Sequence, residues 1–236
     1  MTFSSIISVP RPYNRDGAPS CGIYLLAPKK MQFKQFMVQL QAVLAALNSS
    51  PYQKNMHAVE FQFPEKIFDK EREQASILVG MCKQAGVVAI VRSDVGLCVE
   101  CGADGVMLTE IEEIATARHI LGEAAIIGFD CGNSKEKAEI TLKSGVDYVS
   151  FSTFFASASA KKYADISLLE WWSSATHLPA VAFSKLDVER SIKLAKAGAG
   201  FIGANSWVWE HDEGVKQAIY WLQESIEHGL SQVQIN

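Results

Sequence analysis

The sequence lacks the features that mark several specialised classes of protein. No apolar run approaches the length of a membrane span, and no block of like charges marks a nucleic-acid-binding surface. Residues 1–10 lack the basic segment and long apolar core of a secretory signal. We therefore expect a cytoplasmic protein that binds neither membrane nor nucleic acid and whose partner is a small molecule.

Cysteine is also sparse. The five cysteines are odd in number and scattered, which favours reduced thiols over a disulfide framework. One C-x-x-C pair, Cys98 and Cys101, has no second cysteine or histidine pair at zinc spacing. We interpret this pair as part of the packing of a helix rather than as a metal or redox site.

Common catalytic motifs are missing as well. No G-x-S-x-G, Walker loop or H-E-x-x-H occurs, and none of the five histidines follows a predicted strand. The G-x-G at Gly198–Gly200 precedes a strand instead of following one, so it is not a dinucleotide-binding fingerprint.

What the chain does contain is one repeated unit. At Gly102, Gly145 and Gly198 a glycine closes an amphipathic helix, and a buried strand begins within a few residues. Apolar patterning predicts strands over residues 22–28, 58–63, 87–91, 105–109, 125–129, 148–153, 180–183 and 201–204. It predicts helices over residues 32–48, 68–85, 94–101, 111–121, 134–144, 166–176 and 187–197, and a final helix over much of residues 211–228.

Strict alternation of eight strands with helices predicts a parallel sheet covered by helices. For 236 residues, this count favours a single (β/α)8 TIM barrel over an open doubly wound sheet. We assign residues 1–21 to an N-terminal extension and residues 22–236 to the barrel. Trp171-Trp172 and Trp207/Trp209 are expected to pack between helices and barrel or between the subunits of a homo-oligomer.

In such a barrel, the active site lies where the strands end. Polar residues that follow the predicted strands are Lys29, Glu65, Lys66, Arg92, Asp94, Thr109, Glu110, Asp130, Ser152, Thr153, Ser184, Lys185, Asn205 and Ser206. Asn205-Ser206 and Ser184-Lys185 suit a phosphate group, with simple helix capping as the alternative for the first pair. Lys66 suits a pyrophosphate, or else forms a solvated pair with Glu65.

Carboxylates follow the three central strands. They are Asp94, Glu110, Glu112 and Asp130. Two of them converging at the barrel mouth would suit Mg²⁺, which prefers oxygen ligands and usually shares them with substrate phosphates. Each also fits the first turn of a helix, where an acidic side chain interacts favourably with the dipole. Both interpretations stay open.

Five segments share their order and spacing with one known family. They are Gly102–Leu108 in place of a GADGVHL motif, Ala125–Gly128, Gly145–Val149, Pro179–Ala182, and Gly198–Ile202 with Ser206. Over residues 22–225 the chain therefore resembles the thiamine phosphate synthase family, including its thiazole tautomerase branch. The resemblance implies a barrel that couples a pyrimidine methyl diphosphate to a thiazole phosphate with Mg²⁺ and releases pyrophosphate.

The resemblance also implies where the pyrophosphate and the metal would lie. In the family's Q-x-R-x-K motif, Gln62 and Lys66 are kept, whereas Pro64 replaces the arginine. In its N-D-R motif, Ser93 takes the place of the Asp that binds Mg²⁺. The second Mg²⁺ carboxylate falls near Glu112.

Further correspondences concern the phosphate loops and a second lysine. The family's T-x-T-K loop is matched by Ser157, Ser159 and Lys161, and its Gly-Gly after the seventh strand by Ser184-Lys185. The resemblance therefore implies Lys66 and Lys161 as catalytic residues, and phosphate binding by Ser157, Ser159, Ser184, Lys185 and Ser206. Asn205, beside Ser206 at the end of the eighth predicted strand, is a further phosphate-binding candidate.

Two main hypotheses about function follow. The first is a thiamine phosphate synthase-like barrel with weakened phosphate chemistry, which uses Lys66, Glu112, Lys161 and Ser206. The second is a non-catalytic ligand-binding or regulatory barrel that has lost the metal and pyrophosphate site. A phosphate-handling aldolase or isomerase based on Lys29 or Lys185 is a third, and Met107 in place of the family's histidine disfavours a thiazole tautomerase.

Overall fold

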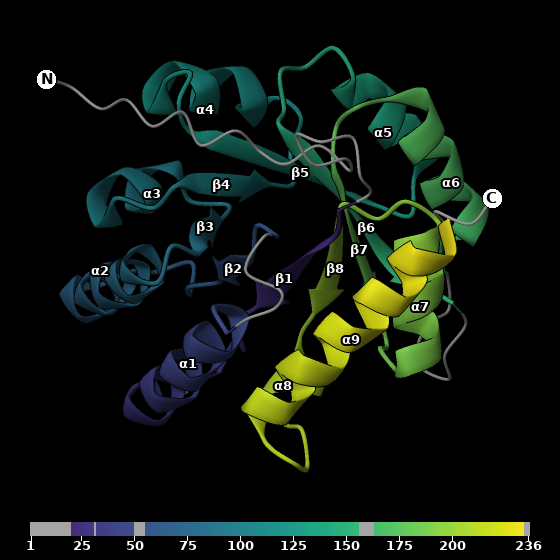
Figure 1. Ribbon diagram of the computed structural model, residues 1–236. Coiled ribbons are helices and arrows are strands. Elements are labelled where there is room, and N and C mark those ends of the chain that lie inside the picture. Colours follow the sequence, from purple (N-terminus) through teal and green to yellow (C-terminus); the bar gives the residue numbers. More distant parts are fainter. Residues whose placement is uncertain (1–19, 31, 50–54, 156–162, 234–236) are drawn as a thin grey trace, which may run out of the picture.

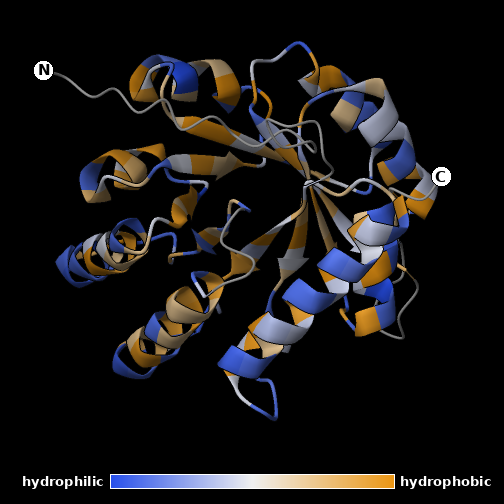
Figure 2. Cartoon of the chain, viewed as in Figure 1, coloured by the Kyte–Doolittle hydropathy of each residue, from blue (hydrophilic) through white to orange (hydrophobic). Residues whose placement is uncertain are grey.

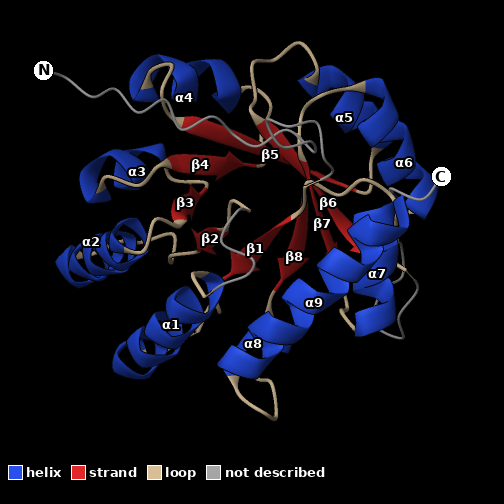
Figure 3. Ribbon diagram, viewed as in Figure 1, coloured by secondary structure: helices blue, strands red, loops and turns tan. Residues whose placement is uncertain are grey.

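The computed structural model describes residues 20–30, 32–49, 55–155 and 163–233. Within these residues, eight parallel strands pair in sequence order and close into a barrel, which helices surround (Figure 1). The strands form the centre and the helices the outer ring in Figure 3. The predicted (β/α)8 TIM barrel is thereby confirmed. Residues 1–19 of the predicted extension lie outside the described residues.

The strands are β1 (Gly22–Leu26), β2 (Ala58–Phe61), β3 (Val88–Arg92), β4 (Gly105–Leu108), β5 (Ile126–Gly132), β6 (Tyr148–Phe154), β7 (Ala180–Ser184) and β8 (Phe201–Ala204). The helices are α1 (Phe33–Leu47), α2 (Asp69–Gln84), α3 (Val95–Cys101), α4 (Glu113–Leu121), α5 (Lys135–Thr141), α6 (Ile166–Ala175), α7 (Val188–Lys196), α8 (Ser206–Trp209) and α9 (Val215–Val233). No helix in the described part of the chain combines the length and apolarity that crossing a membrane requires.

The C-terminal helical region agrees with the prediction in its main helix and differs by one short addition. The helix predicted over much of residues 211–228 is confirmed as α9, which starts at Val215 after a turn in which Gly214 donates to the carbonyl of His211. The short α8 before it was not predicted. A helix of four residues is too short to show an apolar period, so patterning missed α8.

Alternation along the strands divides the core into two layers. Outward-facing residues such as Leu25, Phe61 and Ile127 pack against the helices. Inward-facing residues such as Tyr24, Ile90 and Met107 fill the barrel. Figure 2 shows hydrophobic strands in the centre and hydrophilic residues on the outer helices.

The helix ends follow the local signals in the sequence. The side chains of Ser134 and Asp187 cap α5 and α7, as predicted, by accepting from the amides of Lys137 and Arg190. α3 ends at Gly102, whose φ of 67° is the left-handed conformation that glycine adopts without steric cost. The two caps begin the helices that follow β5 and β7, and Gly102 turns the chain from α3 toward β4.

The C-x-x-C pair lies on α3, as predicted. The thiol of Cys98 is buried and lies 3.4 Å from the carbonyl oxygen of Gly105 on β4. Burial raises the pKa of this thiol to about 12, so it stays protonated near neutral pH. Cys98 therefore behaves as a packing residue between α3 and the barrel.

Gly105 provides a test of how closely β4 and β5 approach. A Cβ atom at this position would lie 2.0 Å from the carbonyl oxygen of Ile126. We expect Gly105→Ala to lower the free energy of unfolding by about 3 kcal/mol, because the backbone of β5 has to move. Urea denaturation measures this change.

Gly80 on α2 is the matched control for that substitution. No atom lies within 4 Å of a Cβ built there, so Gly80→Ala is expected to raise stability by about 0.5–1 kcal/mol through helix propensity. Equal stability of Gly105→Ala and the wild-type protein would contradict the close approach of the two strands.

Candidate functional site

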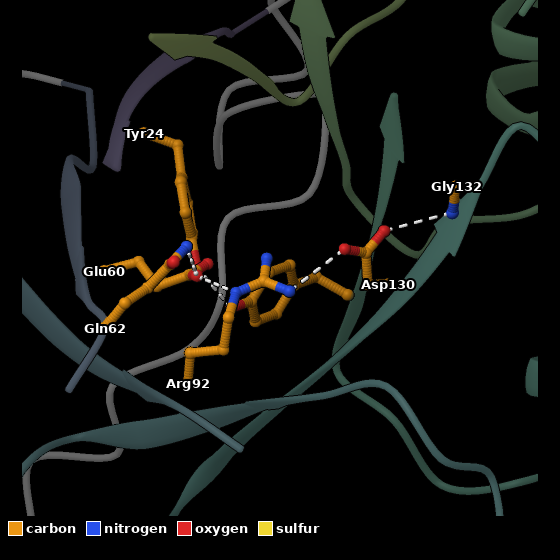
Figure 4. A network of polar contacts seen from close by, with 7 residues as sticks. Tyr24, Glu60, Gln62, Arg92, Asp130 and Gly132 are labelled. Atoms are coloured by element: carbon orange, nitrogen blue, oxygen red, sulfur yellow. Dashed lines mark hydrogen bonds and ion pairs between the residues drawn. The ribbon is translucent and has the colours of Figure 1, made fainter. Parts of the chain in front are cut away.

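The lining of the barrel changes from apolar to polar toward the carboxyl ends of the strands. On β2 the inward side chain after Ala58 is Glu60, and on β3 the inward side chain after Ile90 is Arg92. β5 adds Asp130 near its end. Figure 4 shows these three side chains converging, with Arg92 between the two carboxylates.

Glu60 is the buried anchor of this network. Its side chain has no exposed surface, yet each carboxylate oxygen has partners. Oε2 accepts a 2.7 Å hydrogen bond from the Tyr24 hydroxyl, while Oε1 pairs with Nε of Arg92 and lies 3.5 Å from Nε2 of Gln62. Because a buried carboxylate is costly unless it is paired, these contacts allow Glu60 to lie inside the barrel.

Arg92 links Glu60 to the opposite side of the mouth. Its Nη1 lies 3.1 Å from Oδ2 of Asp130, whose other oxygen accepts from the Gly132 amide at 3.0 Å. The side chains of Arg92 and Asp130 are 20% and 23% exposed, so this end of the network meets solvent. One guanidinium thus faces two carboxylates, one buried and one accessible.

A residue with left-handed backbone follows Arg92 at the end of β3. Ser93 follows it with a φ of 55°, and its amide donates to the Met107 carbonyl at 2.8 Å. A serine in this left-handed region costs about 1–3 kcal/mol. The chain turns there from β3 into α3, and Asp94, the residue after Ser93, caps α3 by accepting from the Leu97 amide at 2.8 Å.

The network fixes the protonation state of its members. Burial alone would lower the pKa of the Arg92 guanidinium, but the Glu60 and Asp130 carboxylates outweigh burial and raise it. Burial and the nearby Glu60 carboxylate raise the pKa of Tyr24 and of Tyr148, whose hydroxyls lie 2.9 Å apart. Near neutral pH the site therefore holds a charged guanidinium and two neutral phenols.

A basic groove adjoins this network on the outside of the barrel. It has a volume of about 840 Å³ and lies between the segments that follow β1 and β2. Four exposed lysines line it, and none makes an ion pair with a residue that the structure describes: Lys29, Lys30, Lys34 and Lys70. The carboxylate of Glu71, also in the groove, accepts from the Phe68 amide at the start of α2.

Gln62 connects the groove to the barrel interior. It lines the groove, and its amide nitrogen contacts Glu60. The site therefore has a basic outer part and an inner part built around one guanidinium and two carboxylates.

Comparison with known proteins assigns the chain to a family. Residues 23–208 match the family described as thiamine monophosphate synthase. The chain belongs to the thiamine monophosphate synthase family. The thiamine-phosphate synthase of Hyphomonas neptunium is 30% identical over 205 residues, covering 85% of this chain and 91% of that protein. That of Rhodospirillum centenum is 28% identical over 202 residues, covering 84% and 94%.

A solved structure supports the fold independently. The thiamine phosphate pyrophosphorylase from Pyrococcus furiosus superposes with a TM-score of 0.70 at 20% identity, over 89% of this chain and 96% of that one. At this identity the likeness concerns the barrel fold. The family resemblance proposed from the sequence motifs is confirmed.

The residues that the sequence resemblance implied follow β2, β7 and β8. Lys66 and Pro64 are exposed in the segment between β2 and α2, and within the described residues Lys66 has no ion-pair partner. Asn205 and Ser206 are exposed where β8 meets α8, with Ser206 Oγ lying 3.5 Å from Oδ1 of Asn205. Lys185 is exposed after β7.

The remaining candidates either bond to the backbone, are exposed without a capping bond, or lie outside the described residues. The Ser184 hydroxyl is buried and donates to the Phe154 carbonyl at 2.8 Å. Asp94 caps α3, and Glu112 is exposed at the start of α4 without making a capping bond. Ser157, Ser159 and Lys161 lie outside the described residues.

The potential Mg²⁺ ligands do not form a ready-made metal centre. In the described ranges, no three Asp, Glu, His or Cys side chains lie close enough together to share an ion. Asp94 uses one carboxylate oxygen as a helix cap. The described side chains therefore provide no closed ligand set, and an ion held mainly by substrate phosphates would need fewer protein ligands.

Sequence reasoning missed Glu60, Tyr24 and Tyr148, because all three lie within strands rather than after them. A signal was present at Glu60. In the alternating pattern of residues 58–63, it occupies an inward position of a barrel strand, where a charged side chain requires a partner.

The tyrosine pair gives the site a measurable alkaline signature. Because the folded-state pKa values of Tyr24 and Tyr148 are raised, their contribution to stability is complete below about pH 10 and is lost as the pH rises further. We expect tyrosinate absorbance to include a delayed component that appears together with unfolding measured by circular dichroism. In a Tyr24→Phe/Tyr148→Phe variant this component should disappear, whereas early ionisation of all tyrosines in a folded chain would contradict the network.

Proposed function

We propose that this member of the thiamine monophosphate synthase family binds a small phosphorylated molecule at the carboxyl ends of β8, β1 and β2. These three strands are neighbours in the barrel, so the residues that follow them form one continuous arc. The observation that carries the proposal is the groove with four lysines that have no carboxylate partner among the described residues.

The charge of the groove contrasts with that of the chain. The whole protein has a formal net charge of −4, whereas the groove gathers four ammonium groups and one carboxylate. Exposed lysines each interact weakly with an anion, and salt screens them, but several around one ligand act together. The aromatic rings of Phe33 and Phe63 also line the groove and offer an apolar contact to the organic part of the ligand.

The motif residues extend the proposed site around the mouth. Lys66 follows β2 near the groove, and Ser206 and Asn205 follow β8 on the other side of β1. We propose that Lys66 contacts the same phosphate group and that Ser206 and Asn205 bind a second one. Mg²⁺ would arrive with the ligand's phosphates, with Glu112 and Asp94 as its candidate protein contacts.

The relatives of this chain are named thiamine-phosphate synthases. The reaction that we propose for this chain is the one that the sequence resemblance implies, coupling of a pyrimidine methyl diphosphate to a thiazole phosphate. We propose that this coupling is slow in the present protein. A departing pyrophosphate needs preorganised positive charge, but Pro64 supplies none and Arg92 is shared between two carboxylates. The shared guanidinium also favours the alternative of a non-catalytic ligand-binding barrel.

Calorimetric titration with inorganic pyrophosphate tests the groove. We expect Lys34→Gln/Lys70→Gln to weaken binding by about tenfold at low salt and by less at high salt, because two of the converging charges are removed. Lys193→Gln is the control, since this exposed lysine is 2.6 Å from Glu189 on α7. Unchanged affinity in the double variant would refute the groove as the phosphate site.

A coupling assay with both phosphorylated precursors and Mg²⁺ separates the two functions. We expect little product even at high enzyme concentration, because transition-state charge is poorly stabilised. Liquid chromatography of thiamine phosphate measures the rate. Rapid multiple turnover would contradict the proposed weak chemistry, whereas pyrophosphate binding with no product would favour the ligand-binding protein.

A further inference from the structure

The guanidinium of Arg92 has hydrogen-bonding capacity that the network does not use. Its Nε faces Glu60 and its Nη1 faces Asp130, whereas Nη2 has no partner among the described residues. An arginine presents five N–H groups in a rigid plane, and its Nη1–Nη2 edge matches two oxygens of a phosphate or carboxylate. On this edge only Nη1 has a partner among the described residues, the carboxylate of Asp130.

The two carboxylates that pair with Arg92 differ in burial and in their other partners. Glu60 is fully buried and also accepts hydrogen bonds from Tyr24 and Gln62, so it holds the guanidinium on the side of the barrel interior. Asp130 is 23% exposed and has a second partner in the Gly132 amide, which it keeps if Arg92 turns to another anion. The pair between Arg92 and Asp130 is therefore the exchangeable half of the network.

Ser150 supplies an independent observation at the same level of the barrel. Ser150 lies on β6 and is paired in register with Asp130 on β5. It comes two residues after the inward-facing Tyr148, so its side chain faces the barrel interior as well. The residue is 1% exposed, and its Oγ has no hydrogen-bond partner among the described residues. Since buried polar atoms are nearly always paired, this hydroxyl indicates a group that enters from the mouth.

We infer that Arg92 binds an oxyanion of the ligand through its Nη1–Nη2 edge and releases Asp130 as it does so, with Ser150 as an additional donor. The inference rests on the proposed binding of a phosphorylated molecule and assigns a cation to the inner part of that site. Gln62, shared by the groove and the network, connects the two parts. Asp130 acts as a competitor that occupies Arg92 until the ligand arrives.

The competition gives opposite expectations for two substitutions. Asp130→Asn removes the competing charge while preserving shape and an acceptor for the Gly132 amide, so pyrophosphate should bind about three- to tenfold more tightly. Arg92→Lys keeps a charge but loses the planar edge, so binding should weaken about tenfold or more. Calorimetry of the folded full-length chain with inorganic pyrophosphate measures both.

The controls separate binding from folding. Arg72→Lys alters an exposed arginine that pairs with Glu100, outside the site, and should leave affinity unchanged. Circular dichroism melting identifies a variant that fails to fold, and the isosteric Asp130→Asn then still decides the question. Asp130→Asn/Arg92→Lys should bind as weakly as Arg92→Lys alone, because relief of competition requires Arg92.

The results distinguish this inference from the proposed function. Suppose that the wild-type protein binds pyrophosphate and that substitution of the groove lysines weakens this binding. If Asp130→Asn and Arg92→Lys then change the affinity less than about twofold, which is within the spread expected of surface substitutions, the role of Arg92 is refuted while the proposed function stands. Binding that depends on Arg92 and Asp130 but not on the groove lysines would refute the groove alone. Absence of binding in every variant would overturn both.

Discussion

A carboxylate buried inside a barrel is the constraint around which this site is organised. Glu60 points into the barrel interior, next to a layer of largely apolar side chains, and without partners its charge would be costly there. Tyr24 from β1 and Arg92 from β3 meet it from the two neighbouring strands. Arg92 in turn brings Asp130 of β5 into the network, so one buried charge orders the mouth of the barrel.

The mouth combines two electrostatic environments. The groove beyond β1 and β2 presents lysines that make no ion pair with any described residue, whereas in the inner network one guanidinium is shared between two carboxylates. A phosphorylated ligand would be attracted to the groove first and would have to compete for Arg92 afterwards. Such an arrangement suits selective binding better than rapid release of pyrophosphate, which needs preorganised and unshared positive charge.

Much of the fold could be predicted from the sequence. The apolar strand over residues 201–204 matches β8, and Ser134 and Asp187 cap the helices that they were expected to begin. These features depend on a few neighbouring residues. The rule that active sites follow barrel strands also selected Arg92 and Asp130, but it said nothing of Glu60, which lies within β2, or of the lysines on α1 and α2 that complete the groove.

By itself the sequence determined the order of strands and helices, their turns and the family, because apolar period, capping residues and glycine positions act over short stretches of chain. Only the tertiary structure decided which polar residues meet. Glu60 lies 32 residues from Arg92, which lies 38 residues from Asp130, and closure of the barrel brings the three together. An ion pair between residues far apart in the chain requires the right strand order, the right register and side chains that both face the barrel interior. Local patterning of the sequence does not specify these three conditions together.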